Sequence, residues 1–339
     1  MKVMVTGGAG YIGSHAVREL LEQGHEVVVL DNLSRGHREA IDSRATLVQG
    51  GTGDRELLRQ IFGTHHPEAV MHFAADIEVG ESVTDPLKYY LNNFSNAIVL
   101  LQEMQSAQIL KFVFSSTAAC YGNPEKTPIE ETQARAPINP YGRSKMMTEM
   151  ALEDLSRAAG FGYTILRYFN VAGASPDALI GEDHHPETHL IPRVLFSARE
   201  NQPVKIFGTD YPTPDGTCVR DYIHVVDLAR AHVLALKSLQ PAEGRIFNLG
   251  SESGFSVREV IAACEKVTGR KLQVIEEARR AGDPAVLVAS SRKIREELGW
   301  ERLYPELETI VTHAWNWHLR RPKGFQSKPQ EPKVAIEMA

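Results

Sequence analysis

The segment VMVTGGAGYIG at residues 3–13 decides the fold of this chain. Its glycines fit two related patterns: Gly8, Gly10 and Gly13 fit G-x-G-x-x-G, and Gly7, Gly10 and Gly13 fit G-x-x-G-x-x-G. A strand-like apolar run precedes the glycines, and an amphipathic helical pattern at 12–23 follows them. Glycine permits a tight turn that brings the backbone close to a pyrophosphate, whose charge the free N–H groups of the helix start can meet. The segment therefore predicts a dinucleotide-binding unit.

The next apolar run, at 26–30, ends on Asp31. A carboxylate at this point accepts hydrogen bonds from an adenosine ribose and repels a 2′-phosphate, which favours NAD over NADP. Arg35 lies close in the sequence and would weaken this preference. The alternative is that Asp31 only caps a turn with Asn32. Because the glycine pattern precedes this carboxylate, we predict NAD as the cofactor.

Short apolar runs alternate with helical patterns through the first half of the chain. The strands are expected at 2–6, 26–30, 46–48, 69–73, 111–114 and 163–166, and the helices at 12–23, 54–62, 86–105 and 141–159. This alternation predicts an α/β fold in which helices cover both faces of a doubly wound parallel sheet, the Rossmann arrangement. Ligand sites in such folds lie at the carboxyl ends of the strands.

The rhythm breaks after about residue 170, where proline and glycine become frequent. We therefore expect an NAD-binding domain at 1–168 and a smaller, mixed α/β substrate domain at 169–321. Part of the second domain, near 220–236, is expected to pack back on the first. The polar segment 322–339 is expected to form a mobile tail.

The composition of the 339 residues excludes several classes of protein. The net charge is −6 and no run of lysine and arginine forms a basic stripe, which argues against nucleic-acid binding. No apolar run approaches the roughly 18 residues that span a bilayer, and the first residues resemble a strand rather than a signal peptide. Three widely separated cysteines suggest neither a disulfide framework nor a cysteine metal site. We expect a cytoplasmic enzyme without membrane partners.

Tyr141 and Lys145 are four residues apart in a segment that reads as a helix start, with Asn139 as its cap and Pro140 in its first turn. They would share one helical face. A cation about 4 Å from a phenol is worth roughly 4 kcal/mol, or about 3 pKa units, at an effective dielectric near 20. That would bring the pKa of Tyr141 from about 10 to near 7, where a general base works best. Tyr-x-x-x-Lys also occurs by chance, but after a dinucleotide fold catalysis is the better interpretation.

One strand earlier, hydroxyl residues follow the apolar run at 111–114. Thr117 is predicted to hydrogen-bond the reacting oxygen of the substrate and the oxygen of Tyr141. Ser115 and Ser116 are expected to have structural roles. The plainer alternative is a strand exit whose hydroxyls satisfy their own backbone.

Taken together, these features resemble the extended short-chain dehydrogenase/reductases and, within them, the UDP-glucose 4-epimerases. The resemblance extends to about Arg320 and rests on many strings: TGGAGYIGSH (6–15), LDNL (30–33), HFAA (72–75), VGES (79–82), PLKYYLNN (86–93), YGRSK (141–145), LRYFN (166–170), GED (181–183), IFG (206–208), YPT (211–213), DGTCVRDYIHVVD (215–227), NLG (248–250) and RRAGD (279–283). Each string alone is unspecific, whereas the combination is highly specific.

The resemblance implies a set of binding residues. Those expected to contact NAD are Gly7, Gly10, Tyr11, Ile12, Gly13, Asp31, Asn32, Gly51, Thr52, Phe73, Ala74, Asn92, Tyr141, Lys145 and Phe169. Those expected to contact a UDP-sugar are Thr117, Tyr141, Asn170, His189, Leu190, Lys205, Phe207, Arg220, Arg280, Asp283 and Leu287. Arginine forks suit a diphosphate, and an aromatic ring can lie against uracil.

Three positions depart from the family pattern. Gly51 replaces an acidic residue that can meet the adenine amino group, Ile77 replaces a lysine that contacts NAD, and His189 replaces an asparagine. The first two changes should weaken the binding of NAD. His184, His185 and His189 could suggest a metal, but the implied mechanism needs none, so we expect no metal site.

The resemblance further implies a homodimer that interconverts UDP-glucose and UDP-galactose, in galactose metabolism, through a transient 4-keto sugar. Leu287, smaller than tyrosine, would leave room for secondary activity on UDP-N-acetylglucosamine. A 4,6-dehydratase is disfavoured because Thr117 is followed by Ala118 and Ala119 rather than by an acidic pair. A 4-epimerase for pentose or uronate UDP-sugars remains an alternative, as does an NAD-binding regulatory protein without turnover.

Overall fold

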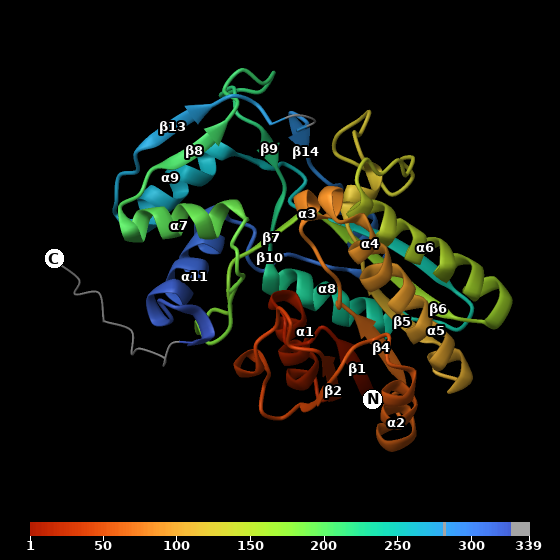
Figure 1. Ribbon diagram of the computed structural model, residues 1–339. Coiled ribbons are helices and arrows are strands. Elements are labelled where there is room, and N and C mark those ends of the chain that lie inside the picture. Colours follow the sequence, from red (N-terminus) through yellow and green to blue (C-terminus); the bar gives the residue numbers. More distant parts are fainter. Residues whose placement is uncertain (281–282, 327–339) are drawn as a thin grey trace.

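The computed structural model describes residues 1–280 and 283–326, which are arranged around one parallel sheet (Figure 1). The order of its strands is β11-β6-β5-β4-β1-β2-β3. Their bounds are β1 Lys2–Thr6, β2 Glu26–Asp31, β3 Thr46–Gln49, β4 Ala69–His72, β5 Lys111–Ser115, β6 Gly162–Tyr168 and β11 Gly244–Leu249. Neighbouring strands pair in parallel throughout, and Thr6 at the end of β1 is in register with both Leu30 and His72. The predicted doubly wound sheet is confirmed.

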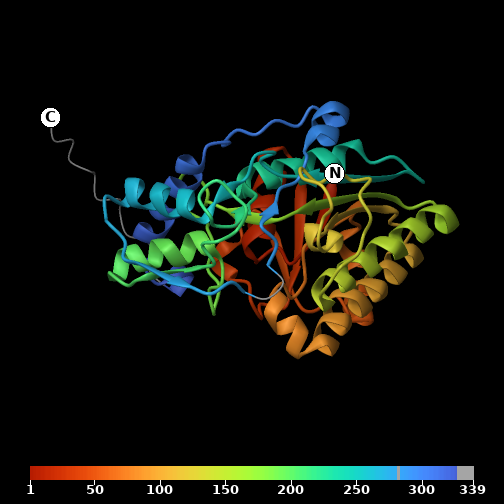
Figure 2. The same ribbon diagram turned by 90° about the horizontal axis from the view of Figure 1, so that it is seen from above.

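Helices cover both faces of this sheet. Val3 and Val5 of β1 contribute to one apolar core with α1 (Tyr11–Glu22) and α8 (Val225–Ser238). Met4, between them, faces the other core, with α2 (Arg55–His65), α5 (Asn96–Ser106) and α6 (Pro140–Ala159). Alternate side chains of a buried strand point to opposite faces, which explains this division. Figure 2 shows α8 on one side of the sheet and α5 and α6 on the other.

The seventh strand, β11, is not among the expected strands. It lies after α8 in the sequence, and its Leu249 pairs in register with Tyr168 of β6. Helix α8 packs beside α1 over the same face of the sheet. The segment 225–249 therefore belongs spatially to the sheet, because the chain returns to it after building part of the smaller lobe.

The single helix expected at 86–105 is wrong in detail. The chain forms α4 (Pro86–Tyr89), a π-helical segment η2 (Tyr90–Ser95) and then α5. The wider π turn is a feature often found at functional sites. Here Asn93 is buried, and its side-chain oxygen accepts a hydrogen bond of 2.8 Å from the Asp76 N–H. Asn92, one residue earlier, donates to the Asp76 carboxylate at 3.0 Å.

The smaller lobe is mixed α/β, as expected (Figure 1). Its short strands are β7 Asn170–Ala172 paired with β10 Tyr222–His224, β8 Val204–Phe207 paired with β13 Val274–Glu277, and β9 Val219–Arg220 between β12 Phe255–Ser256 and β14 Val286–Leu287. Its helices are α7 Leu190–Glu200, α9 Val257–Thr268, α10 Arg292–Leu298 and α11 Leu307–Arg320. The core of this lobe lies between β8, α7, α9 and α11.

Part of the segment expected to form a mobile tail is packed against the protein. Phe325, in the turn η4 (Gly324–Gln326), is buried and stacks on His37 with ring centroids 5.0 Å apart. Burial of this aromatic ring holds residues 322–326 in place, and the remainder, 327–339, lies outside the described residues. None of the helices in the described segments is long and apolar enough to cross a membrane.

Candidate active site

The glycine-rich turn connects β1 to α1 and packs closely against the neighbouring backbone. Gly7 has φ +71°, and a Cβ there would lie 2.6 Å from the backbone nitrogen of Ala74. A Cβ at Gly13 would lie 2.1 Å from the Gly7 carbonyl oxygen, so the helix approaches the turn closely only because this residue is glycine. Gly10 caps α1 without a side-chain hydrogen bond, which leaves the first N–H groups of the helix available to an anion. This cradle fits a dinucleotide pyrophosphate.

Asp31 closes the same turn from β2. Its two carboxylate oxygens accept hydrogen bonds from the N–H groups of Ala9, at 2.9 Å, and Leu33, at 2.8 Å. Asn32 is exposed beside it, with its side-chain oxygen accepting from the N–H of Ser34. A carboxylate that accepts two backbone N–H groups is fixed in orientation, so Asp31 positions the glycine turn as well as offering an acceptor for a ribose.

Other residues expected at NAD follow the carboxyl ends of β1, β3 and β4. Phe73 and Ala74 follow β4 directly, and the Phe73 N–H donates to the Thr6 carbonyl at 3.0 Å. Tyr11 is buried and its hydroxyl donates to the Gly173 carbonyl at 2.7 Å, which links α1 to the smaller lobe. Thr52 is buried beyond β3.

Tyr141, Thr117 and Lys145 meet at the carboxyl ends of β5 and β6. The Asn139 side chain accepts the Gly142 N–H at 2.8 Å and Pro140 begins α6, as predicted. Thr117 lies two residues beyond β5, and its hydroxyl forms a hydrogen bond with the Tyr141 side chain. The Lys145 ammonium is buried and donates to the Ser115 carbonyl at 2.9 Å.

Ser115 and Ser116 have other partners, as expected of structural hydroxyls. The Ser115 hydroxyl forms a short hydrogen bond with Tyr168, and that of Ser116 donates to Glu149 at 2.6 Å. Thr117 is therefore the hydroxyl of this group that faces Tyr141.

The expected pKa of Tyr141 near 7 is wrong for the protein by itself. Burial raises the pKa of Tyr141 to about 12, and the hydrogen bond with Thr117 only partly opposes this. Burial also lowers the pKa of Lys145 to about 7, against the opposing charge of Glu149. The expectation counted the attraction between a cation and a phenolate but not the cost of burying both, which dominates here.

Glu149 is a residue near the catalytic group that sequence reasoning missed. It lies four residues after Lys145 on α6, so the spacing of Tyr141, Lys145 and Glu149 was the available signal. Its carboxylate is fully buried and accepts hydrogen bonds from Arg167 of β6 at 3.0 and 2.5 Å. The same carboxylate accepts a hydrogen bond from the hydroxyl of Ser116, the residue before Thr117, and its charge acts on Lys145.

Several residues expected at the UDP-sugar meet around β9 and β14. Arg220 forms a close ion pair with Asp283 and is in register with Leu287. Leu287 packs, together with Phe169, against the apolar cluster that contains Ala118 and Tyr121. The strands thus bring these positions to the segment that follows Thr117.

Others of the expected set lie further out in the smaller lobe. The Arg280 guanidinium lies 3.9 Å from the centroid of the Phe207 ring, a cation–π contact. Lys205 shares one face of β8 with Phe207, but its ammonium pairs with Glu277 at 2.9 Å in an exposed position. Asn170 donates to the Asp221 carbonyl at 3.0 Å.

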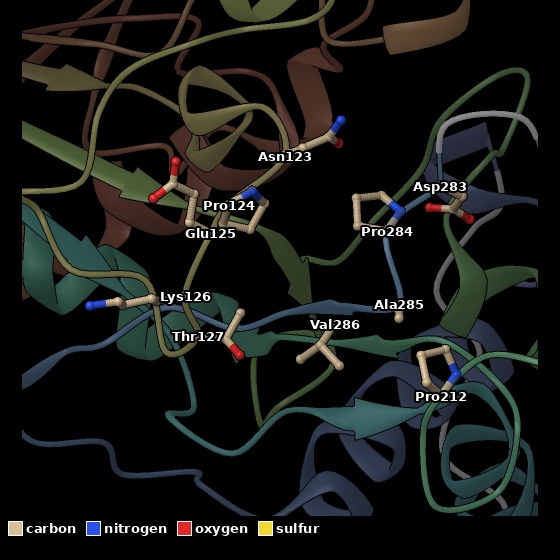
Figure 3. Close-up of a pocket in the computed structure, with 10 residues that line it drawn as sticks. All are labelled: Asn123, Pro124, Glu125, Lys126, Thr127, Pro212, Asp283, Pro284, Ala285 and Val286. Atoms are coloured by element: carbon tan, nitrogen blue, oxygen red, sulfur yellow. The ribbon is translucent and has the colours of Figure 1, made fainter.

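A cavity of about 530 Å³ lies beside this group (Figure 3). Residues 123–127 line one side, and residues 283–286 with Pro212 line the other. Among the expected site residues it includes Asp283 alone, so it borders the nucleotide end of the site rather than the Tyr141 end.

Comparisons with known proteins agree with this arrangement. Residues 3–250 match the NAD dependent epimerase/dehydratase family. A UDP-glucose 4-epimerase from Lacticaseibacillus casei is 51% identical over 96% of this chain and 99% of its own. One from Halalkalibacterium halodurans is 51% identical over 98% and 99%. Among solved structures, a UDP-glucose 4-epimerase from Bifidobacterium longum in complex with NAD+ and UDP is 37% identical, with TM-score 0.91 over 96% of this chain and 100% of its own.

Proposed function

Since the chain belongs to the NAD dependent epimerase/dehydratase family, we propose that it is an isomerase that interconverts UDP-glucose and UDP-galactose, in galactose metabolism. The observation that carries the proposal is the group of Tyr141, Thr117 and Lys145 at the carboxyl ends of the strands, the same edge of the sheet at which the glycine-rich turn follows β1. Relatives that share about half of its residues over nearly the whole chain are UDP-glucose 4-epimerases.

NAD is the cofactor, and the residues present fit it. The uncapped start of α1 and the glycine cradle suit the pyrophosphate, and Asp31 suits a ribose without a 2′-phosphate. When bound, NAD supplies a reversible acceptor for the hydride at C4 of the sugar. The protein supplies orientation and proton transfer.

Tyr141 is proposed to take the proton of the sugar 4-hydroxyl and later to return it. Its raised pKa keeps the phenol protonated in the protein by itself, so a cation must stabilise the phenolate during turnover. Lys145, one turn along α6, is the group of this chain placed to do so, and the oxidised nicotinamide adds a second positive charge. Thr117 orients the reacting hydroxyl through its hydrogen bond with Tyr141.

The nucleotide half is proposed to stay anchored while the flat 4-keto sugar turns over to present its other face. Arg220, Arg280 and Phe207 carry the charges and the ring that suit a diphosphate and a uracil. The close pair of Arg220 with Asp283 must loosen or share its charge when a diphosphate binds.

The direct test of this function is incubation of the purified chain with UDP-galactose, followed by chromatographic analysis of the products. We expect conversion to a mixture of UDP-galactose and UDP-glucose. UDP-arabinopyranose, UDP-galacturonate and UDP-N-acetylglucosamine should be run in parallel, with slower turnover of the N-acetylated sugar because Leu287 leaves space without a hydrogen bond. A faster reaction with a pentose or uronate UDP-sugar would identify that sugar as the preferred substrate. If none of the four UDP-sugars were converted, the proposal that the chain is an epimerase would be wrong.

Gly51 offers a test of how NAD is held. A Cβ at this position would meet no atom within 4 Å, so a side chain can be added without a clash. We expect Gly51→Asp to lower the Kd for NAD about tenfold, because a hydrogen bond from the adenine amino group to a carboxylate is worth about 1.5–3 kcal/mol. The Kd is measured by titration calorimetry on protein freed of NAD.

The matched control for this change is Gly63→Asp, which adds the same carboxylate at an open, exposed position on α2. It should leave the Kd for NAD unchanged. If the wild-type protein and Gly51→Asp bound NAD with equal affinity, a carboxylate at position 51 would make no contact with the adenine amino group.

We also propose that the chain acts as a homodimer through α3 (Val79–Thr84), α4, η2 and α6. These elements lie side by side (Figure 1). Val83, Leu87, Leu91 and Met150 are large apolar side chains exposed on them, and Leu87 is 71% exposed. Exposed apolar groups gathered on one helical surface are typical of an interface.

The expected result for the double variant Leu87→Glu/Leu91→Glu is conversion of the dimer to a monomer, because four buried carboxylates would have to lose their water on association. Multi-angle light scattering after gel filtration measures the mass. Leu303→Glu, at another exposed leucine, is the control and should keep the wild-type mass. A wild-type protein with the mass of one chain would contradict the dimer.

A cytoplasmic location is proposed as well. All three cysteines, Cys120, Cys218 and Cys264, are free and buried. Unpaired cysteines of this kind suit a reducing compartment.

A further inference from the structure

The turn between β7 and α7 carries a cluster of side chains of which only His189 is among the residues expected at the UDP-sugar. It contains Glu182, His184, Glu187 and His189, each of which offers one ligand atom. These four atoms all lie within 4.8 Å of one another. The residues come from eight consecutive positions, so the local course of the turn, rather than a chance meeting of distant segments, brings them together.

The nitrogens and oxygens of this cluster point at one another. His189 Nδ1 lies 2.8 Å from Glu182 Oε1 and 3.0 Å from Glu187 Oε1. His184 Nδ1 lies 3.1 Å from the same Glu182 oxygen and 3.9 Å from Glu187 Oε2. Both imidazoles therefore present the same type of nitrogen to a shared pair of carboxylates.

The two carboxylates of the cluster suit a cation. Glu182 is buried, with 4% of its side chain exposed, and Glu187 is half-buried. In the part of the chain that the structure describes, the ion pairs of both carboxylates are with histidines and none is with lysine or arginine. A metal ion would displace the protons that lie between the imidazoles and the carboxylates, and the two carboxylates with two neutral imidazoles would then carry the charge of −2 that one divalent cation balances.

We propose that these four residues bind a divalent transition-metal ion, with Zn²⁺ as the best match. Two imidazole nitrogens and two carboxylate oxygens form a four-coordinate ligand set of the kind that Zn²⁺ accepts, with metal–ligand distances of about 2.0–2.2 Å. Imidazole is a poor ligand for Mg²⁺ and Ca²⁺, which prefer oxygen ligands only. Small movements of the side chains within the turn bring the four atoms to those distances from one centre.

The ion would stabilise the contact between the lobe that contains the parallel sheet and the smaller lobe. The His184 ring packs edge-on against Tyr11 of α1, with centroids 6.3 Å apart. The Glu182 carbonyl accepts a hydrogen bond of 3.0 Å from Trp317 of α11, and His189 caps the start of α7. A metal bound here ties α1, α7 and α11 to one turn. The ion takes no part in the proposed proton and hydride transfers, and the inference meets the proposed function only at His189, one of the residues expected at the UDP-sugar.

Zinc binding is measured on the tag-free full-length protein after removal of metals with a chelator and exchange into metal-free buffer. Titration calorimetry with ZnCl₂ should give one saturable site per chain. At about a hundredfold excess over Kd, bound Zn²⁺ should raise Tm by about 3–5 °C. Neither readout depends on turnover, so failure of the metal site and failure of the proposed function are distinguishable.

Two variants and a matched control locate the site. His184→Ala and the milder Glu187→Gln should each weaken Zn²⁺ binding at least tenfold. The control is His185→Ala, since His185 lies in the same turn but is exposed and faces Asp183 instead. The proposal is overturned if the wild-type protein shows no saturable Zn²⁺ binding, if Glu187→Gln binds as tightly as the wild type, or if His185→Ala loses as much affinity as His184→Ala.

Discussion

Replacement of Tyr141 by phenylalanine should lower kcat for the conversion of UDP-galactose by about 10²–10⁴-fold, the usual contribution of a positioned acid/base group. The change removes one oxygen from a half-buried side chain and keeps its ring. The hydrogen bond with Thr117 is lost, whereas Arg220 and Phe207 at the nucleotide end are untouched. The affinity for UDP, measured by calorimetry, should therefore stay within about twofold of the wild type.

The matched control is Tyr163→Phe, which also removes one phenolic hydroxyl but lies near the opposite end of β6. It should leave kcat within about twofold of the wild type. If Tyr141→Phe retained more than a tenth of the wild-type kcat with normal UDP affinity, Tyr141 would not be the base. A loss of both kcat and UDP affinity would instead indicate damage to the fold.

Replacement of Arg167 by methionine should lower the free energy of unfolding by about 3–5 kcal/mol, because it leaves the buried Glu149 carboxylate without its buried partner. Glu149 and Arg167 are almost completely buried, at 0% and 1% exposed. The guanidinium also donates to the Tyr121 hydroxyl at 2.7 Å, and Tyr121 donates to the side-chain oxygen of Asn248 at 2.8 Å. Urea denaturation followed by circular dichroism measures this loss.

Two comparisons separate the buried charge from the simple loss of an arginine. Arg135→Met removes a half-exposed guanidinium that contacts the same carboxylate at 3.2 Å, and it should cost about 1 kcal/mol or less. Adding Glu149→Gln to Arg167→Met should restore part of the lost stability, because the unpaired charge is then gone. Equal costs for Arg135→Met and Arg167→Met would contradict the account of the buried pair.

The sequence predicted those parts of the structure that depend on interactions between residues close together in the chain. The glycines at 7, 10 and 13 dictate a turn that few other residues permit, and the apolar runs around them repeat with the spacing of a parallel sheet. The start of α6 was predictable because Asn139 and Pro140 act within one turn of the helix. The six strands of the first half lie within one or two residues of their expected ends, because each consists of an apolar run bounded by polar or glycine residues nearby in the sequence.

The parts that were not predicted depend on contacts between distant segments. Strand β11 joins the sheet only after the chain has left it, so its pattern alone does not assign it. The π turn at Asn93 depends on Asp76, and the pair of Glu149 and Arg167 joins a helix to a strand. The pKa of Tyr141 depends on burial, which spacing along a helix does not reveal.

The histidine-rich turn illustrates the same limit at the level of a site. His184, His185 and His189 were visible in the sequence, but the expectation of no metal rested on the reaction rather than on the turn itself. The structure separates them: His184 and His189 face Glu182 and Glu187, whereas His185 points elsewhere. The path of the backbone determines which of the histidines lie close enough together to bind one metal ion.

The central claim is that the chain inverts C4 of a UDP-sugar with NAD and without net oxidation. UDP-galactose that carries deuterium at C4 tests it most directly, with the UDP-glucose product analysed by mass spectrometry and proton NMR. The account predicts that UDP-glucose forms in ordinary water and still carries the deuterium at C4, because the hydrogen that leaves this carbon returns to it. Formation of UDP-glucose with the deuterium lost to solvent, or no formation of UDP-glucose at all, would contradict the account.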